Sequence, residues 1–119
     1  MASVFIAEDD LYLSRLYKLI LELAGHRVIG IASNGEMAVN IYKSLLKKPD
    51  IIIMDQRMPI KDGIETAKEI LQINRRAKII FTSANKKVNK EALSIGIVSV
   101  LDKPFNAENL VNKIQICLD

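Results

Sequence analysis

Polar side chains that could together hold a metal ion and a phosphoryl group follow four short apolar runs of the chain. They are Glu8 and Asp9 after Val4–Ala7, Asp55 after Ile51–Met54, Ser83 after Ile79–Thr82, and Lys103 shortly after Val98–Leu101. Three carboxylates in one place repel, and one of them would bind a proton unless a cation neutralised them. Mg²⁺ typically takes one or two carboxylates with waters and phosphate oxygens. The set therefore predicts a magnesium-dependent phosphoryl site, provided that the strand ends meet.

Each of these side chains suits one role in phosphoryl transfer. A carboxylate can act as a nucleophile and become an acyl phosphate, and Asp55 has the position for this role. Glu8 and Asp9 would hold the ion. Lys103 would contact a phosphate oxygen as a point charge, and Ser83 would hydrogen-bond another.

The elements that must position these residues alternate between short apolar runs and segments with helical periodicity. This alternation predicts βα units and a parallel sheet. The unbroken run Ile51–Met54 after Pro49 is typical of a strand buried on both faces. Right-handed βαβ connections bring the carboxyl ends of such strands to one edge. The expected strands are 4–7, 28–32 (an edge or closely packed strand, because of Gly30), 51–55, 79–82 and 98–101; the expected helices are about 10–24, 35–45, 62–73, 87–95 and 106–118.

Composition limits the class of protein. A chain of 119 residues, 50% of them hydrophobic, predicts one globular domain. No apolar stretch is long enough for a membrane span, and no signal-peptide layout is present. A single cysteine, Cys117, argues for a reducing cytoplasm. Because there is also only one histidine, His26, any metal is expected to be held by oxygen atoms. The net charge of +3 comes from dispersed lysines without interleaved aromatic residues, which argues against nucleic-acid binding.

Simpler interpretations exist for every residue taken alone. Acids suit the start of a helix, Asp55 could merely close a strand, and Ser83 and Lys103 could be turn and surface residues. Their joint occurrence after successive strands favours a site. The remaining chemistry-bearing residues are expected to be structural, with His26 solvated in a loop, Cys117 a packing residue, and Tyr12, Tyr17 and Tyr42 packing residues on helix faces.

In sequence order, these motifs resemble the receiver domain of two-component response regulators, of the stand-alone, CheY-like kind. The matching pieces are Glu8-Asp9-Asp10, Asp55 with Met58-Pro59, Asp62-Gly63, Ser83-Ala84 and Lys103-Pro104-Phe105. Each piece alone is weak, but all five in order are specific. The resemblance covers residues 1–119 as a single receiver domain. It implies a flavodoxin-like three-layer sandwich with five helices and a five-stranded parallel sheet in the order 2-1-3-4-5.

The resemblance also implies a function. Asp55 would accept a phosphoryl group from a phosphohistidine of a histidine kinase or a histidine phosphotransfer protein, with Mg²⁺ required and Mn²⁺ as an alternative ion. The backbone carbonyl of Arg57 would be a further metal ligand, and Lys103-Pro104 would be a cis peptide bond. The modified domain would alter the surface of its fourth helix, fifth strand and fifth helix for a downstream protein, as a monomer or a phosphorylation-linked dimer. It would be no enzyme beyond its own phosphorylation and dephosphorylation.

One departure from the family pattern keeps alternatives open. The switch position on the fifth strand is usually aromatic but is Val100 here, and valine cannot make the same large swing. One alternative is a binding module that acts without phosphorylation, and another is a receiver cut from a longer regulator. An enzyme or flavin protein on the same fold is disfavoured. Glu8, Asp9 and Asp10 would repel a flavin phosphate, and Asp55-Gln56-Arg57 lacks the Asp-x-Asp of aspartyl-phosphate hydrolases.

Overall fold

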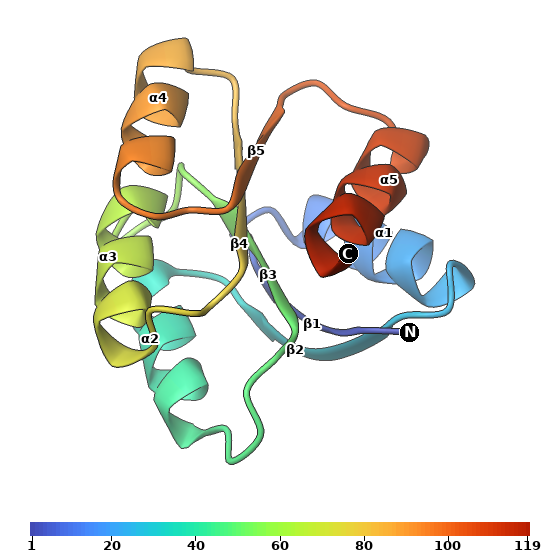
Figure 1. Ribbon diagram of the computed structural model, residues 1–119, viewed down its shortest axis with the longest axis horizontal. Helices are drawn as coiled ribbons and strands as arrows, with labels where there is room; N and C mark the ends of the chain where they lie inside the picture. Colours follow the sequence, from blue (N-terminus) through green and yellow to red (C-terminus); the bar gives the residue numbers. More distant parts are fainter.

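Five parallel strands form a single sheet in the computed structural model, which describes residues 1–119 (Figure 1). The strands are β1 (Ser3–Ala7), β2 (Arg27–Ala32), β3 (Ile51–Asp55), β4 (Ile79–Ser83) and β5 (Ser99–Asp102). Their order is β2-β1-β3-β4-β5, so the predicted topology is confirmed. The order reverses between β1 and β3, which is where ligands gather in open α/β sheets.

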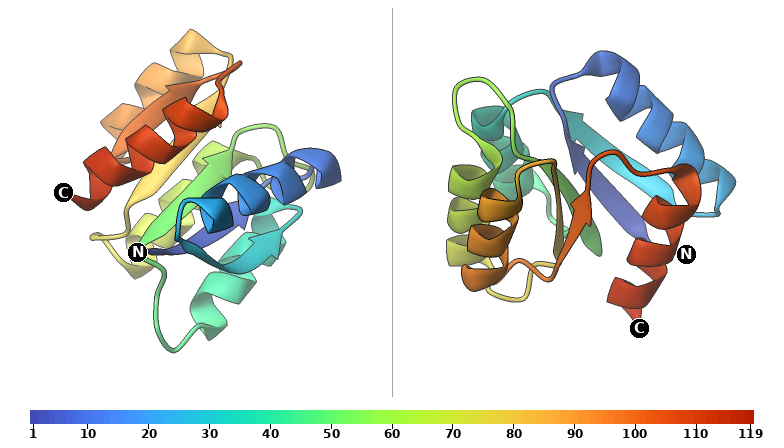
Figure 2. Two further views of the ribbon diagram at one scale, coloured as in Figure 1. Left: turned by 90° about the vertical axis from the view of Figure 1, so that its right-hand side faces the viewer. Right: turned by 90° about the horizontal axis from the view of Figure 1, so that it is seen from above.

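Five helices cover both faces of the sheet. They are α1 (Leu11–Leu23), α2 (Gly35–Ser44), α3 (Gly63–Ile73), α4 (Lys86–Ser94) and α5 (Ala107–Leu118). Figures 1 and 2 show α1 and α5 on one face, and α2, α3 and α4 on the other. Every helix begins after an Asp or Asn whose side chain accepts a backbone N–H of the first turn; these caps are Asp10, Asn34, Asp62, Asn85 and Asn106.

The core lies on both sides of the central strand. Ile52 and Met54 pack on the side of α2, α3 and α4, whereas Ile51 and Ile53 pack on the side of α1 and α5. All residues of β3 are buried, including Asp55. The unbroken apolar run therefore has the physical reason expected from the sequence, because neither face of β3 meets water.

Strand β2 lies at the edge of the sheet and is closely packed at Gly30, as the sequence indicated. It pairs only with β1 at the end of the sheet. A Cβ at Gly30 would lie 3.1 Å from Cδ1 of Phe5, so the aromatic ring fills the space that a side chain would need.

Two expectations about individual residues are wrong. His26 is buried, because the turn at Gly25 brings its ring against β1, where Nδ1 accepts the backbone N–H of Ala2 at 3.1 Å. Tyr12 is 72% exposed rather than packed. The buried residues of α1 are Ser14, Tyr17 and Leu21, and Tyr12 lies outside the face that they form.

Gly63 is a position where the backbone needs the absence of a side chain. A Cβ there would collide with the carbonyl oxygen of Asp55 and would lie 2.8 Å from Cα of Gln56. We expect Gly63→Ala to lower the free energy of unfolding by about 2–3 kcal/mol, measured by urea denaturation. Gly30→Ala is the control, since its Cβ would meet only side-chain atoms, those of Phe5 and Ile41, and it should cost clearly less. Equal losses for both variants would contradict the backbone collision.

Candidate acidic pocket at the carboxyl edge of the sheet

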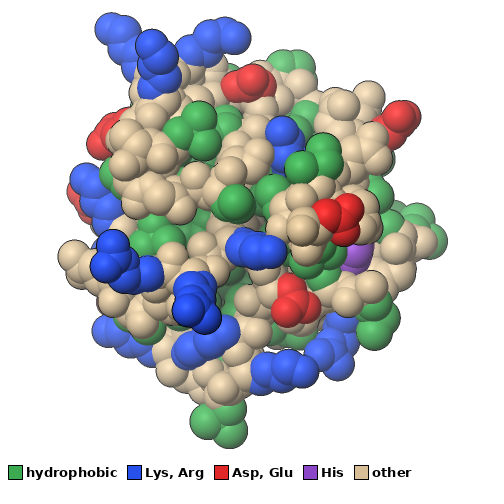
Figure 3. All heavy atoms as spheres, viewed as in Figure 1, with side chains coloured by type: hydrophobic (Ala, Val, Ile, Leu, Met, Phe, Trp, Pro, Cys, Tyr) green, Lys and Arg blue, Asp and Glu red, His purple; other side chains and the backbone are tan.

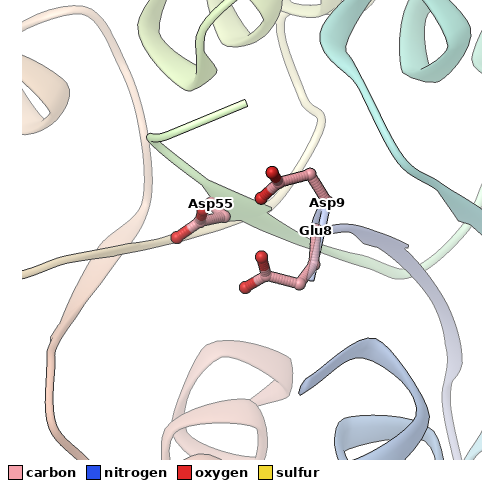
Figure 4. Close-up of side chains that lie close together, drawn as sticks. All are labelled: Glu8, Asp9 and Asp55. Atoms are coloured by element: carbon pink, nitrogen blue, oxygen red, sulfur yellow. The ribbon is translucent and has the colours of Figure 1, made fainter. Parts of the chain in front are cut away.

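Three carboxylates meet where β1 and β3 end. Glu8 and Asp9 follow β1, and Asp55 is the last residue of β3. Each contributes a carboxylate oxygen to a group whose members lie within 4.8 Å of one another. Figure 4 shows Glu8 and Asp9, from one segment, directed toward the space beside Asp55. Glu8 and Asp55 are buried and Asp9 is exposed, so the cluster opens to solvent at Asp9.

Lys103 supplies the nearby positive charge. Its Nζ lies 2.6 Å from Oδ1 of Asp55 and 3.5 Å from Oε1 of Glu8. The backbone N–H of Lys103 donates to the carbonyl of Ser83 at 3.0 Å, and the Lys103-Pro104 bond is cis, as the resemblance implied. Burial alone would lower the pKa of the Lys103 ammonium, but the hydrogen bond and charge of Asp55 outweigh it and the pKa is raised. Lys103 is therefore held in its charged form.

The pocket carries more negative charge than Lys103 neutralises. Burial, and then the charge of Asp55, raises the pKa of Glu8 to about 7, although the N–H of Asp10 donates to Glu8 Oε2 at 3.1 Å. A carboxylate in this state gains from a cation. The donor atoms are all oxygens, which suits a hard divalent ion. Glu8, Asp9 and Asp55 thus form a cluster that could hold a metal.

Ser83 and Arg57 line a cavity beside Asp55. This cavity, of about 780 Å³, is lined by Asp55, Gln56, Arg57, Ser83, Ala84, Asn85, Val88 and Lys103. The Ser83 hydroxyl accepts the backbone N–H of Asn85 at 2.9 Å and makes no hydrogen bond to Asp55. The structure therefore gathers all the predicted site residues at one edge, while the roles assigned to them stay predictions.

Two side chains near Asp55 were not foreseen. The Thr82 hydroxyl, fully buried, donates to Asp55 Oδ1 at 3.2 Å. Gln56 braces the loop after Asp55, since its Oε1 accepts the N–H of Ile64 at 2.9 Å and its Nε2 donates to Asp62 at 3.3 Å. The sequence held only a weak signal for Thr82, a polar residue that follows the apolar run Ile79–Phe81. Its pairing with Asp55 is seen in the register of β3 and β4.

An open parallel sheet in this order, with acids and a lysine converging at its carboxyl edge, defines a receiver-type α/β signalling domain. The chain belongs to the response regulator receiver domain family, whose family model matches residues 4–115. The family is that of two-component signalling.

Individual relatives are similar over nearly the whole chain. The chemotaxis protein CheY of Thermotoga maritima is 39% identical over 114 residues, which are 94% of this chain and 93% of that protein. The chemotaxis protein CheY of Bacillus subtilis is 35% identical over 118 residues, or 98% of this chain and 97% of that protein. Among solved structures, a CheX-CheY-BeF3-Mg complex from Borrelia burgdorferi matches with a TM-score of 0.93 and 26% identity, covering 98% of this chain and 89% of that chain.

None of the five helices combines the length and the apolar character that crossing a bilayer needs.

The raised pKa of Glu8 predicts how pH affects the stability of the metal-free protein. Between the ordinary value of 4.5 and about 7, the folded state binds a proton at Glu8 that the unfolded state has released. The contribution of Glu8 to the free energy of unfolding therefore falls as pH rises through this window. Urea denaturation in EDTA should show that the free energy of unfolding falls more between pH 5 and pH 8 in the wild type than in Glu8→Gln. Equal pH dependence in both proteins would contradict the assignment.

Proposed function

We propose that this domain is a phosphoacceptor switch of a two-component or phosphorelay pathway. Asp55 takes a phosphoryl group from a phosphohistidine of a histidine kinase or a histidine phosphotransfer protein, and a downstream protein recognises the result. The supporting observation is the 2.6 Å contact between Lys103 and Asp55 inside an acidic cluster that also contains Glu8 and Asp9. Membership of the receiver family supports the same conclusion.

The chemistry follows from the atoms around Asp55. A carboxylate oxygen of Asp55 bonds to phosphorus as the phosphorus–nitrogen bond of the phosphohistidine breaks, and the electron pair stays on the imidazole. Lys103 stabilises the charge on the transferring oxygens. Mg²⁺, when bound by Glu8, Asp9, Asp55 and the carbonyl of Arg57, supplies the remaining charge neutralisation. The Ser83 hydroxyl releases the backbone N–H of Asn85 and instead donates to an oxygen of the phosphoryl group.

A polar path leads from Ser83 to the surface of α4 and β5. Asn89 is buried on α4, and its Nδ2 donates to Asp102 Oδ1 at 2.7 Å and to the carbonyl of Ser83 at 3.4 Å. Asn89 Oδ1 is buried without a partner, so this contact is poised for rearrangement. Movement of Ser83 would thus reach α4 without the aromatic swing that Val100 cannot make.

The outer face of α4 is suited to a protein partner. Lys86, Lys87 and Lys90 are exposed there and line a groove with Val100 and Asp102. Basic side chains project at the upper left of the molecule, where Figure 1 places α4 (Figure 3). We infer that a partner of the α4–β5–α5 surface meets a positively charged region on α4.

A second candidate function is a binding module that acts without phosphorylation, and Val100 favours it. Val100 is half-buried and packs against the core cluster that contains Phe81. The aromatic ring that would swing in the family's switch is absent at this position. A pull-down with and without beryllofluoride, a phosphoryl mimic, separates the two functions. Capture that depends on beryllofluoride supports the switch, whereas equal capture, also by Asp55→Asn, supports the constitutive module.

Asp55 should be the only residue modified by a small-molecule phosphodonor. With acetyl phosphate and Mg²⁺, intact-mass spectrometry should show an increase of one phosphoryl group, absent in Asp55→Asn. Asp119→Asn, at the C-terminal end of α5, is the matched control and should be modified like the wild type. No modification of the wild type, or modification of Asp55→Asn, would contradict the proposal.

Mg²⁺ should stabilise the folded state through the acidic cluster. At an ion concentration about tenfold above the dissociation constant, a site present only in the folded protein contributes about 1.4 kcal/mol. Thermal unfolding should therefore shift upward with MgCl2 in the wild type and in Asp119→Asn, but little in Asp9→Asn. A shift of the same size in Asp9→Asn would show that the ion binds elsewhere.

A further inference from the structure

Thr82 lies directly beside the residue that we propose as phosphoacceptor. It pairs with Asp55 in the parallel register of β3 and β4, and its side chain is completely buried. Its hydroxyl donates to Asp55 Oδ1 at 3.2 Å. Threonine is β-branched and stiff at χ1, so the position of this donor is fixed by the strand.

Both protein contacts of the Asp55 side chain go to the same oxygen. Thr82 and Lys103 both donate to Oδ1, whereas no protein group donates to Oδ2. Asn89 Oδ1 is the only side-chain oxygen or nitrogen that is fully enclosed and lacks a hydrogen-bond partner. Asp55 Oδ2 also lacks a partner, so it is not fully enclosed. Oδ2 is therefore within reach of solvent and free to attack phosphorus. Oδ1 would then become the carbonyl oxygen of the acyl phosphate, still beside the Thr82 hydroxyl.

We propose that Thr82 is a positioning residue that shortens the lifetime of the phosphoryl group on Asp55, an inference that rests on the proposed function. In hydrolysis, the oxygen of a water bonds to phosphorus and the bond from phosphorus to Oδ2 breaks. The electron pair returns to the Asp55 carboxylate, and dihydrogen phosphate leaves with both protons of the water.

The sign of the effect follows from where charge develops. Negative charge grows on the carboxylate as the phosphorus–oxygen bond breaks, and it is shared with Oδ1. A hydroxyl aimed at Oδ1 stabilises this charge more than it stabilises the neutral carbonyl of the acyl phosphate. Thr82 therefore favours loss of the phosphoryl group. Lys103 differs in kind, because its flexible ammonium can follow the phosphoryl oxygens whereas the threonine hydroxyl stays on the strand.

The test compares Thr82→Val with Thr82→Ser. Valine keeps the branched shape and removes the donor, whereas serine keeps the donor and loses a methyl group. Each protein is phosphorylated with acetyl phosphate and Mg²⁺, the donor is removed, and the decay is followed by intact-mass spectrometry. We expect hydrolysis in Thr82→Val to be about threefold to tenfold slower, the range that one hydrogen bond accounts for. The hydrolysis rate of Thr82→Ser should lie within about twofold of the wild-type rate.

Several results would overturn the inference. Decay of Thr82→Val at the wild-type rate, or faster, would make Thr82 a packing residue. Equal slowing in Thr82→Val and Thr82→Ser would assign the effect to side-chain shape rather than to the hydroxyl. If Thr82→Val fails to fold by circular dichroism, Thr82→Cys replaces it as a weak donor of similar size, with slower decay expected. A wild type that takes no phosphoryl group would instead overturn the proposed function, and this inference with it.

Discussion

The concentration of negative charge at the ends of β1 and β3 is the constraint on which the rest of the site depends. Glu8 and Asp55 are buried, and a single ammonium, that of Lys103, lies between them. Burial makes each uncompensated carboxylate costly, as the raised pKa of Glu8 shows. The fold therefore holds a site that is incomplete without additional positive charge. This imbalance, more than any single residue, is the reason to expect that the pocket binds a cation.

The scaffold is built to keep these charges together. The central strand β3 is buried on both faces, so Asp55 cannot move without disturbing two hydrophobic clusters. Gly63 packs against the backbone of Asp55 and Gln56, and its N–H donates to the carbonyl of Gln56 at 3.0 Å. On the other side, the backbone of Lys103 is fixed to β4 through Ser83. The backbones that carry Asp55 and Lys103 are thus held from both flanks of the pocket.

Sequence reasoning predicted the parts of this arrangement that depend on local pattern. Unbroken apolar runs located the strands, Asp10 and Asn106 marked helix starts, and parallel topology required Asp55 and Lys103 to meet. It failed where the outcome depends on three-dimensional packing. The burial of His26 follows from a turn that places its ring beside Ala2, just before β1, and the exposure of Tyr12 follows from its position outside the buried face of α1. Thr82 became visible only with the register of β3 and β4, which no local pattern specifies.

The two hydroxyls at the end of β4 show how one strand can serve two purposes. Successive residues of a strand face opposite sides of the sheet. Thr82 is buried and donates to Asp55, whereas the Ser83 hydroxyl accepts the backbone N–H of Asn85 before α4 and the Ser83 carbonyl accepts from Asn89. A change at Asp55 that draws Ser83 inward must break the contact with Asn85 and strain the one with Asn89. Under the proposed function, the Thr82 hydroxyl would govern how long the phosphoryl group lasts, and the Ser83 hydroxyl would report its presence to α4. Separating these roles would let a chain with valine at position 100 act as a switch without the aromatic swing.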